Sequence, residues 1–198
     1  METQKTGFAA GRTKKMTITG MLGAISVVLG FTPLGFIPIG LANVTTMHIP
    51  VIIGAIVEGP FVGAMVGLIF GISSLIKSFM TPTPISFIFM NPLVSVVPRV
   101  LIGILTYYFY TAMQKVVRNE KTVLLLSGAF GTLVNTVLVL GTAYLLYAQR
   151  IVEAMSLPEG GAFAFFMGIA TTNGVPEMIV AAVVTAASVT AIKKIVKN

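Results

Sequence analysis

The chain has 198 residues, of which 56% are hydrophobic and only 10% are charged, against roughly 25% charged residues in an ordinary soluble domain. With a mean hydropathy of +0.96, it lacks the polar residues that cover a water-facing surface, which excludes a water-soluble enzyme or binding module. We therefore expect an all-α integral membrane protein in which residues 1–198 form a single membrane domain.

Six apolar runs predict six transmembrane helices, at residues 16–32, 47–57, 60–76, 93–113, 122–148 and 173–192. The second run is short for a full crossing, so five spans with a re-entrant second run is the alternative. The loop from Phe31 to Thr46 is rich in Gly and Pro but mostly apolar, and we expect it to lie against the protein.

The positions of the basic residues predict the orientation of these spans. With the N-terminus inside, ten of the thirteen Lys and Arg residues fall on the cytoplasmic side: Lys5, Arg12, Lys14, Lys15, Lys115, Arg118, Lys121, Lys193, Lys194 and Lys197. The positive-inside rule therefore favours six spans with both termini cytoplasmic, residues 1–15 forming a cytoplasmic segment and residues 16–195 the helical bundle. The net charge of +7 is then a topology signal and does not indicate a nucleic-acid partner.

Glycines recur at four-residue spacing in the third run, at Gly59, Gly63, Gly67 and Gly71. This spacing places them on one helical face, where missing side chains allow another backbone to approach closely. We expect the stripe to pack helices within the chain, with contact to another subunit as the alternative. The first run carries a shorter pair of small residues, Gly20 and Ala24.

Ionisable residues inside spans are costly and usually mark function. Arg99 and Glu177 are the two in this chain, and other polar residues converge with them on the outer half of the predicted bundle, whereas its inner half is apolar. This geometry predicts a pocket open to the outside. The candidate substrate-binding residues are Asn43, Thr45, His48, Lys77, Asn91, Arg99, Asn173 and Glu177.

Structural roles remain open for several of these polar residues. Arg99 and Glu177 could neutralise one another as a pair, and Lys77 could extend to the outer headgroups. His48 could cap the second helix as readily as it could contact a ligand. We interpret Asn135, near the predicted midplane, as a hydrogen-bonding residue between helices.

Several kinds of chemistry have no residues to support them. The sequence lacks the Gly-rich Lys and Ser/Thr motif that cradles phosphates, so the chain is not expected to hydrolyse ATP itself. With one histidine and neither cysteine nor aspartate, it offers no zinc site, serine triad or aspartyl dyad. We therefore expect no enzyme, no cofactor and no metal, and we predict a capture subunit that relies on partners.

Two stretches resemble the substrate-specific (S) components of energy-coupling factor (ECF) vitamin transporters: MHIPVIIGAIVEGPFVGAMVGLIFGISSL at residues 47–75 and NPLVSVVPRVLIG at residues 91–103. The resemblance covers about residues 16–195. It implies a six-helix protein of the bacterial plasma membrane that binds a vitamin under the loop between spans one and two. It also implies a transmembrane T component and two cytoplasmic ATPases as partners. The family's first helix presents Ala-xxx-Ala to the T component, and here Gly20 and Ala24 occupy that pattern.

The entry to the second span, Thr45 to Pro50, looks most like the pantothenate-type members. Pantothenate is a small anion with hydroxyl and amide groups, so Arg99 or Lys77 could bind its carboxylate. Asn43, Thr45, Asn91 and Asn173 could then bond the rest of the molecule. Riboflavin, pyridoxine and folate remain alternative substrates, and a self-sufficient secondary carrier or channel is a less favoured class of function.

Overall fold

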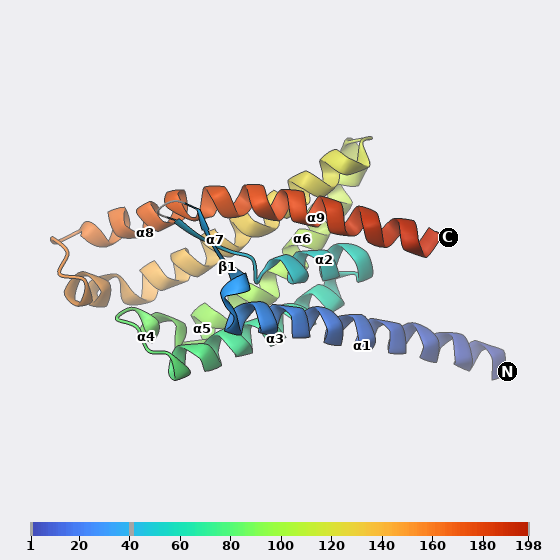
Figure 1. The fold of residues 1–198 in the computed structure, drawn as a ribbon, viewed down its shortest axis with the longest axis horizontal. Helices are drawn as coiled ribbons and strands as arrows, with labels where there is room; N and C mark the ends of the chain where they lie inside the picture. The colour runs from blue at the N-terminus through green and yellow to red at the C-terminus, as the bar shows by residue number, and fades with distance from the viewer. Residues whose placement is uncertain (1, 40–41, 198) are drawn as a thin grey trace.

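The chain folds into a bundle of helices interrupted by one β-hairpin (Figure 1). The computed structural model describes the backbone of residues 2–39 and 42–197, and the side chains of residues 11–35 and 45–195. In chain order the elements are α1 (Glu2–Phe31), η1 (Pro33–Gly35), β1 (Phe36–Ile39), β2 (Ala42–Thr45), α2 (Ile49–Glu58), α3 (Pro60–Met80), α4 (Ser86–Phe89), α5 (Pro92–Ser95), α6 (Val97–Val116), α7 (Glu120–Ala154), α8 (Gly161–Thr172) and α9 (Gly174–Lys197).

Five helical segments of the described chain are long and apolar enough to cross a membrane: Gly11–Phe31, Pro60–Met80, Pro92–Val116, Glu120–Ala154 and Gly161–Ile195. Helix α2 has only 10 residues, or about 15 Å at 1.5 Å per residue, half of a hydrocarbon core of about 30 Å. The predicted count of six transmembrane helices is therefore not confirmed. The last segment also begins twelve residues before the predicted boundary at 173, because apolar α8 continues through a break at Asn173 into α9.

The loop between the first two predicted spans contains the one departure from an all-α fold within the described residues. Strand β1 pairs with β2 in antiparallel register, from Phe36 opposite Thr45 to Ile39 opposite Ala42. β-branched residues in both strands and Phe36 in β1 favour this pairing. The segment lies against the helices as expected, since the backbone N–H of Thr45 donates to Oε1 of Glu177 in α9, 2.8 Å away.

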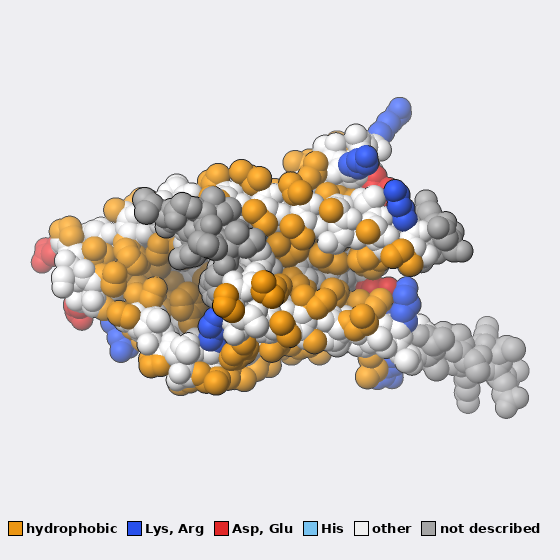
Figure 2. Space-filling view, in the orientation of Figure 1, with side chains coloured by type: hydrophobic (Ala, Val, Ile, Leu, Met, Phe, Trp, Pro, Cys, Tyr) orange, Lys and Arg blue, Asp and Glu red, His pale blue; other side chains and the backbone are white. Residues whose placement is uncertain are grey.

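Both chain termini lie at the same end of the bundle, which we call the terminal end (Figure 1). Lys14 pairs there with Glu58 at the α2–α3 turn, with 2.8 Å between Nζ and Oε1, and Lys193 of α9 pairs with Glu120 at the start of α7. Figure 2 shows Lys and Arg side chains gathered at this end and hydrophobic side chains along the body of the bundle. The opposite, distal end carries α4, α5 and the connection between α7 and α8 (Figure 1).

Three of the four glycines in the predicted stripe pack α3 against α6 within the chain, whereas Gly59 precedes α3 and a Cβ atom there would meet nothing within 4 Å. A Cβ atom placed on Gly67 would lie 2.1 Å from the carbonyl oxygen of Arg99, and one on Gly63 would lie 3.0 Å from the Cα of Gly103. Gly71 meets the backbone of Val96 in the same way, at 2.8 Å. The two backbones are so close that no side chain fits between them.

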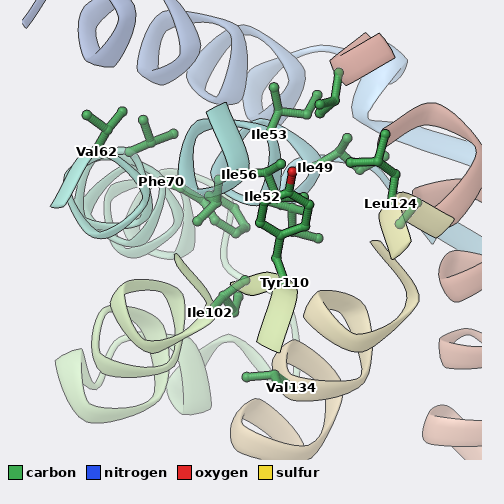
Figure 3. Close-up of a cluster of buried hydrophobic side chains, with 14 of the residues drawn as sticks. Ile49, Ile52, Ile53, Ile56, Val62, Phe70, Ile102, Tyr110, Leu124 and Val134 are labelled. Carbon is green, nitrogen blue, oxygen red and sulfur yellow. The ribbon is translucent and has the colours of Figure 1, made fainter. Parts of the chain in front are cut away.

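Two clusters of buried apolar side chains stabilise the two halves of the bundle. The larger one (Figure 3) is built from α2 and from the parts of α3, α6, α7 and α9 nearest the terminal end, and it includes Ile52, Val66, Ile102 and Leu124. The smaller one joins α4, α5, the distal half of α7 and α8, and it includes Phe166. The polar residues discussed below lie between these clusters.

Candidate binding cavity

A cavity of about 410 Å³ lies between the two apolar clusters, within the range of about 300–1,000 Å³ typical of small-molecule sites. Its walls come from α3, α4, α6, α7, α8 and α9, from the last turn of α1, and from the segments that join α1 to α2 and α3 to α4. Its polar lining residues are Thr45, Ser73, Ser74, Lys77, Ser78, Thr81, Thr83, Ser86, Arg99, Asn135, Thr136, Asn173 and Glu177.

Five of the eight predicted binding residues line this cavity, although they come from four separate parts of the chain. Thr45 ends β2, Lys77 lies in α3, Arg99 lies in α6, and Asn173 and Glu177 lie at and just after the break between α8 and α9. The structure thus brings these five polar residues together at one cavity.

Arg99 is the most buried cation of the site, with 6% of its surface exposed. Its Nη1 donates to the carbonyl of Val94, and its guanidinium carbon lies 5.5 Å and 5.8 Å from the ring centres of Phe70 and Phe89. Its Nε has no hydrogen-bond partner among the described residues. Arg99 therefore presents an unused donor and an uncompensated charge in a largely apolar surround.

Glu177 is equally buried, at 6% exposed, but its hydrogen bonds go to Thr45. Its Oε1 accepts hydrogen bonds from the backbone N–H and the hydroxyl of Thr45, both at 2.8 Å. Arg99 and Glu177 form no ion pair with each other, and the ion pairs found among the described side chains are the two at the terminal end. The two in-span charges thus face one cavity without neutralising one another.

Lys77 donates to the carbonyl of Gly30 in the last turn of α1, at 2.6 Å. Its ammonium therefore lies beside the negative end of the α1 helix dipole. It lines the cavity and also joins α3 to α1.

Two described residues of the predicted site, His48 and Asn91, do not line the cavity. His48 is 1% exposed and lies next to Thr132 of α7, with 2.9 Å between Nε2 and Oγ1; it occupies the N-cap position of α2, but its side chain makes no capping bond. Asn91 caps α5 by accepting from the N–H of Leu93, and it donates to the Tyr147 hydroxyl at 3.0 Å. The side chain of Asn43 lies outside the described residues.

Asn135, which the sequence predicts to form a hydrogen bond between helices, lines the cavity. Its Oδ1 is buried and accepts no hydrogen bond from the described residues. The Ser and Thr residues around Lys77 were also left out of the predicted site. Ser74, Ser78 and Thr81 follow one another at helical spacing on the face that holds Lys77, a signal that could have identified this wall.

The lining defines what kind of molecule the cavity suits. It holds two cations, Lys77 and Arg99, and one carboxylate, Glu177, so it is suited to an anion with hydroxyl or amide groups. No cluster of three metal-binding side chains occurs in the described part of the chain. The site therefore has the chemistry of a binding pocket for a small polar anion.

Residues 14–189 match the family model described as ECF transporter, substrate-specific component. The chain therefore belongs to this family, as the resemblance of residues 47–75 and 91–103 implied, and it is a multi-pass protein of the bacterial cell membrane. The family is a class of transporter component and not a class of enzyme.

Two relatives align with most of the chain. The Pantothenic acid transporter PanT of Lactococcus lactis subsp. cremoris is 32% identical over 168 residues, which cover 78% of this chain and 80% of the relative. The Pantothenate transporter PanT of Leuconostoc mesenteroides subsp. mesenteroides is 29% identical over 188 residues, which cover 89% of this chain and 90% of the relative.

Proposed function

We propose that this S component captures pantothenate in the cavity between α3, α6, α7 and α9 and passes it to an ECF T component driven by two ATPases. The names of the two relatives support this substrate. The observation that carries the proposal is Arg99, a buried cation that lines the cavity without an acidic partner among the described side chains.

Pantothenate has one carboxylate, and the proposed mechanism assigns it to Arg99. A buried guanidinium is stabilised only when a counter-charge and hydrogen bonds replace water, and a carboxylate supplies both. Lys77 is the less favoured choice, because it already donates to Gly30 of α1. It contributes to the positive potential of the site at longer range.

The remainder of pantothenate carries two hydroxyl groups and an amide, which match the polar walls. The unused Oδ1 of Asn135 needs a donor, and a ligand hydroxyl or amide N–H provides one. Ser74 and Thr136 supply hydroxyls that can donate and accept. The Ser78 hydroxyl donates to the carbonyl of Ser74 at 2.8 Å and supplies an acceptor. Phe70, Phe89 and Val139 supply apolar contacts for the carbon skeleton.

The orientation of the protein in the membrane is part of the same proposal. The terminal end carries the concentration of Lys and Arg seen in Figure 2, and by the positive-inside rule it faces the cytoplasm. The cavity then lies in the outer half. The pairing of Glu58 with Lys14 supports a chain that returns to the inner side at the end of α2, as a path of six passes requires, even though α2 itself is short.

Binding of labelled pantothenate to the purified protein, without ATP, tests the proposal. We expect one molecule per chain, and Arg99→Ala should weaken binding by about tenfold or more, the effect of losing a charged hydrogen bond. Arg150→Ala is the matched control, since Arg150 is exposed and stacks on Phe87 outside the cavity lining.

Two results would contradict the proposal in different ways. Absence of pantothenate binding together with binding of riboflavin, pyridoxine or folate would overturn the substrate and leave the capture role. Pantothenate flux into liposomes that contain this chain alone would overturn the capture role and favour a self-sufficient carrier.

A further inference from the structure

Glu177 joins two parts of the chain that are 132 residues apart in sequence. A single oxygen, Oε1, accepts both the N–H and the hydroxyl of Thr45 at 2.8 Å. Thr45 is the last residue of β2, and Glu177 lies in the first turn of α9. We call this pair of hydrogen bonds between Glu177 and Thr45 the clasp. Within the described part of the chain, it links Thr45 to the helices.

The clasp lies between a well-attached segment and the hairpin that precedes it. Beyond Thr45, the chain is fixed by the bond from Ser26 of α1 to Met47 and by the contact of His48 with Thr132 of α7. Before Thr45, β2 pairs with β1 alone in a two-stranded sheet, and such an isolated hairpin is marginally stable by itself. Among the described residues, the two bonds to Glu177 tie the Thr45 end of the hairpin to α9.

The charges in the cavity argue against a direct role for Glu177 in holding the substrate. The proposed substrate is an anion, and a carboxylate that faces it repels its acid group. Both residues of the clasp line the cavity, so releasing Thr45 from Glu177 frees part of the wall. Glu177 therefore contributes to substrate binding by holding Thr45 in the cavity wall.

We propose that Glu177 is a positioning residue that fixes the hairpin at Thr45 as a wall of the cavity and so slows the release of bound substrate. This inference rests on the proposed function, because it takes pantothenate as the occupant of the cavity. It assigns the two in-span charges separate roles: Arg99 contacts the ligand, and Glu177 acts through Thr45.

The test compares two substitutions of the same residue. Glu177→Gln keeps an oxygen that accepts both bonds from Thr45 but removes the charge, whereas Glu177→Ala removes both. In pulse-chase dissociation of labelled pantothenate, we expect Glu177→Ala to release the ligand about tenfold faster and Glu177→Gln to release it at close to the wild-type rate. Glu159→Ala, at an exposed position between α7 and α8, is the matched control.

Substitutions of Thr45, the residue that Glu177 bonds, provide a second and independent test. Thr45→Val removes the hydroxyl bond and keeps the N–H bond, so release should accelerate less than in Glu177→Ala, and Thr45→Ser should restore it. The double variant Glu177→Ala/Thr45→Val should release ligand no faster than Glu177→Ala alone, because both changes break one contact. If Glu177→Ala does not fold, as judged by thermal unfolding, the Thr45→Val and Thr45→Ser pair still decides the question.

The position of the hairpin can be followed directly, because the chain contains no cysteine. A single cysteine at Ala42, the first residue of β2, should react faster with a maleimide in the Glu177→Ala background and at an unchanged rate in the Glu177→Gln background.

The outcomes that overturn the inference differ from those that overturn the function. If Glu177→Gln accelerates release as much as Glu177→Ala, the charge itself acts on the ligand and the positioning role is wrong. Additive effects of Glu177→Ala and Thr45→Val also contradict it. Absence of pantothenate binding to the wild-type protein would instead overturn the proposed function.

Discussion

Gly67 of α3 lies directly against the backbone of Arg99 in α6. A Cβ atom at position 67 would lie 2.1 Å from the Arg99 carbonyl oxygen and 2.7 Å from its carbonyl carbon. The depth of the arginine in the cavity is therefore set by a glycine on the neighbouring helix, because α6 can approach α3 only where no side chain intervenes.

Gly67→Ala should displace this part of α6 and weaken both folding and binding. Because the obstacle is backbone and cannot rotate away, we expect a loss of about 1–3 kcal/mol in unfolding free energy together with weaker pantothenate binding. Thermal unfolding and equilibrium binding in detergent measure the two effects. Gly20→Ala is the control, since nothing lies within 4 Å of a Cβ at that position; equal behaviour of the two variants would contradict the proposed packing role.

The binding energies of Arg99 and of the pantothenate carboxylate should depend on each other. A thermodynamic cycle that changes the residue, the ligand or both tests this coupling. Pantothenol has an alcohol in place of the carboxylate, so the wild-type protein should prefer pantothenate by about tenfold or more. In Arg99→Met, which keeps an apolar chain of similar length, this preference should disappear. Competition binding measures all four combinations of protein and ligand. An undiminished preference for pantothenate in Arg99→Met would show that another residue, such as Lys77, binds the carboxylate.

Tyr110 is a hydrogen-bonding centre at the terminal end and should affect stability without affecting the cavity. Its hydroxyl accepts from Gln114 at 2.7 Å and from Lys193 at 2.9 Å. Tyr110→Phe should therefore lower the free energy of unfolding by about 1 kcal/mol and leave pantothenate affinity unchanged. Tyr108→Phe, at a site 61% exposed, is the matched control, and a loss of affinity in Tyr110→Phe would show that the two ends of the bundle are coupled.

Gly20 and Ala24 lie on an exposed face of α1 and are the proposed contact with the T component. Gly20→Trp should prevent assembly with the T component and the ATPases, because a bulky ring blocks close approach of another helix. It should leave pantothenate binding by the isolated chain intact. Co-purification with the T component measures assembly. Gly168→Trp in α8 is the control, because a Cβ there also meets nothing within 4 Å, and assembly that survives Gly20→Trp would contradict the contact.

The sequence by itself determined the class of protein and the neighbourhood of the site. Scarce charge and long apolar runs fixed the membrane environment, because uncompensated polar groups are excluded from the bilayer. Arg99 and Glu177 are the two charged residues inside the predicted spans, which made them functional candidates. Both line the cavity. The glycine spacing in the third run identified the α3 packing face.

Only the tertiary structure decided which polar groups meet. Hydropathy locates a helix along the chain but does not fix its rotation or the neighbour that each face contacts. For this reason the sequence left the pairing of Arg99 with Glu177 open, assigned Asn135 to a contact between helices and included His48 in the pocket. Close packing of α3 on α6 and the return of the hairpin onto α9 settle these contacts: Glu177 holds Thr45, His48 meets Thr132, and Arg99 faces the cavity without an acidic partner among the described side chains.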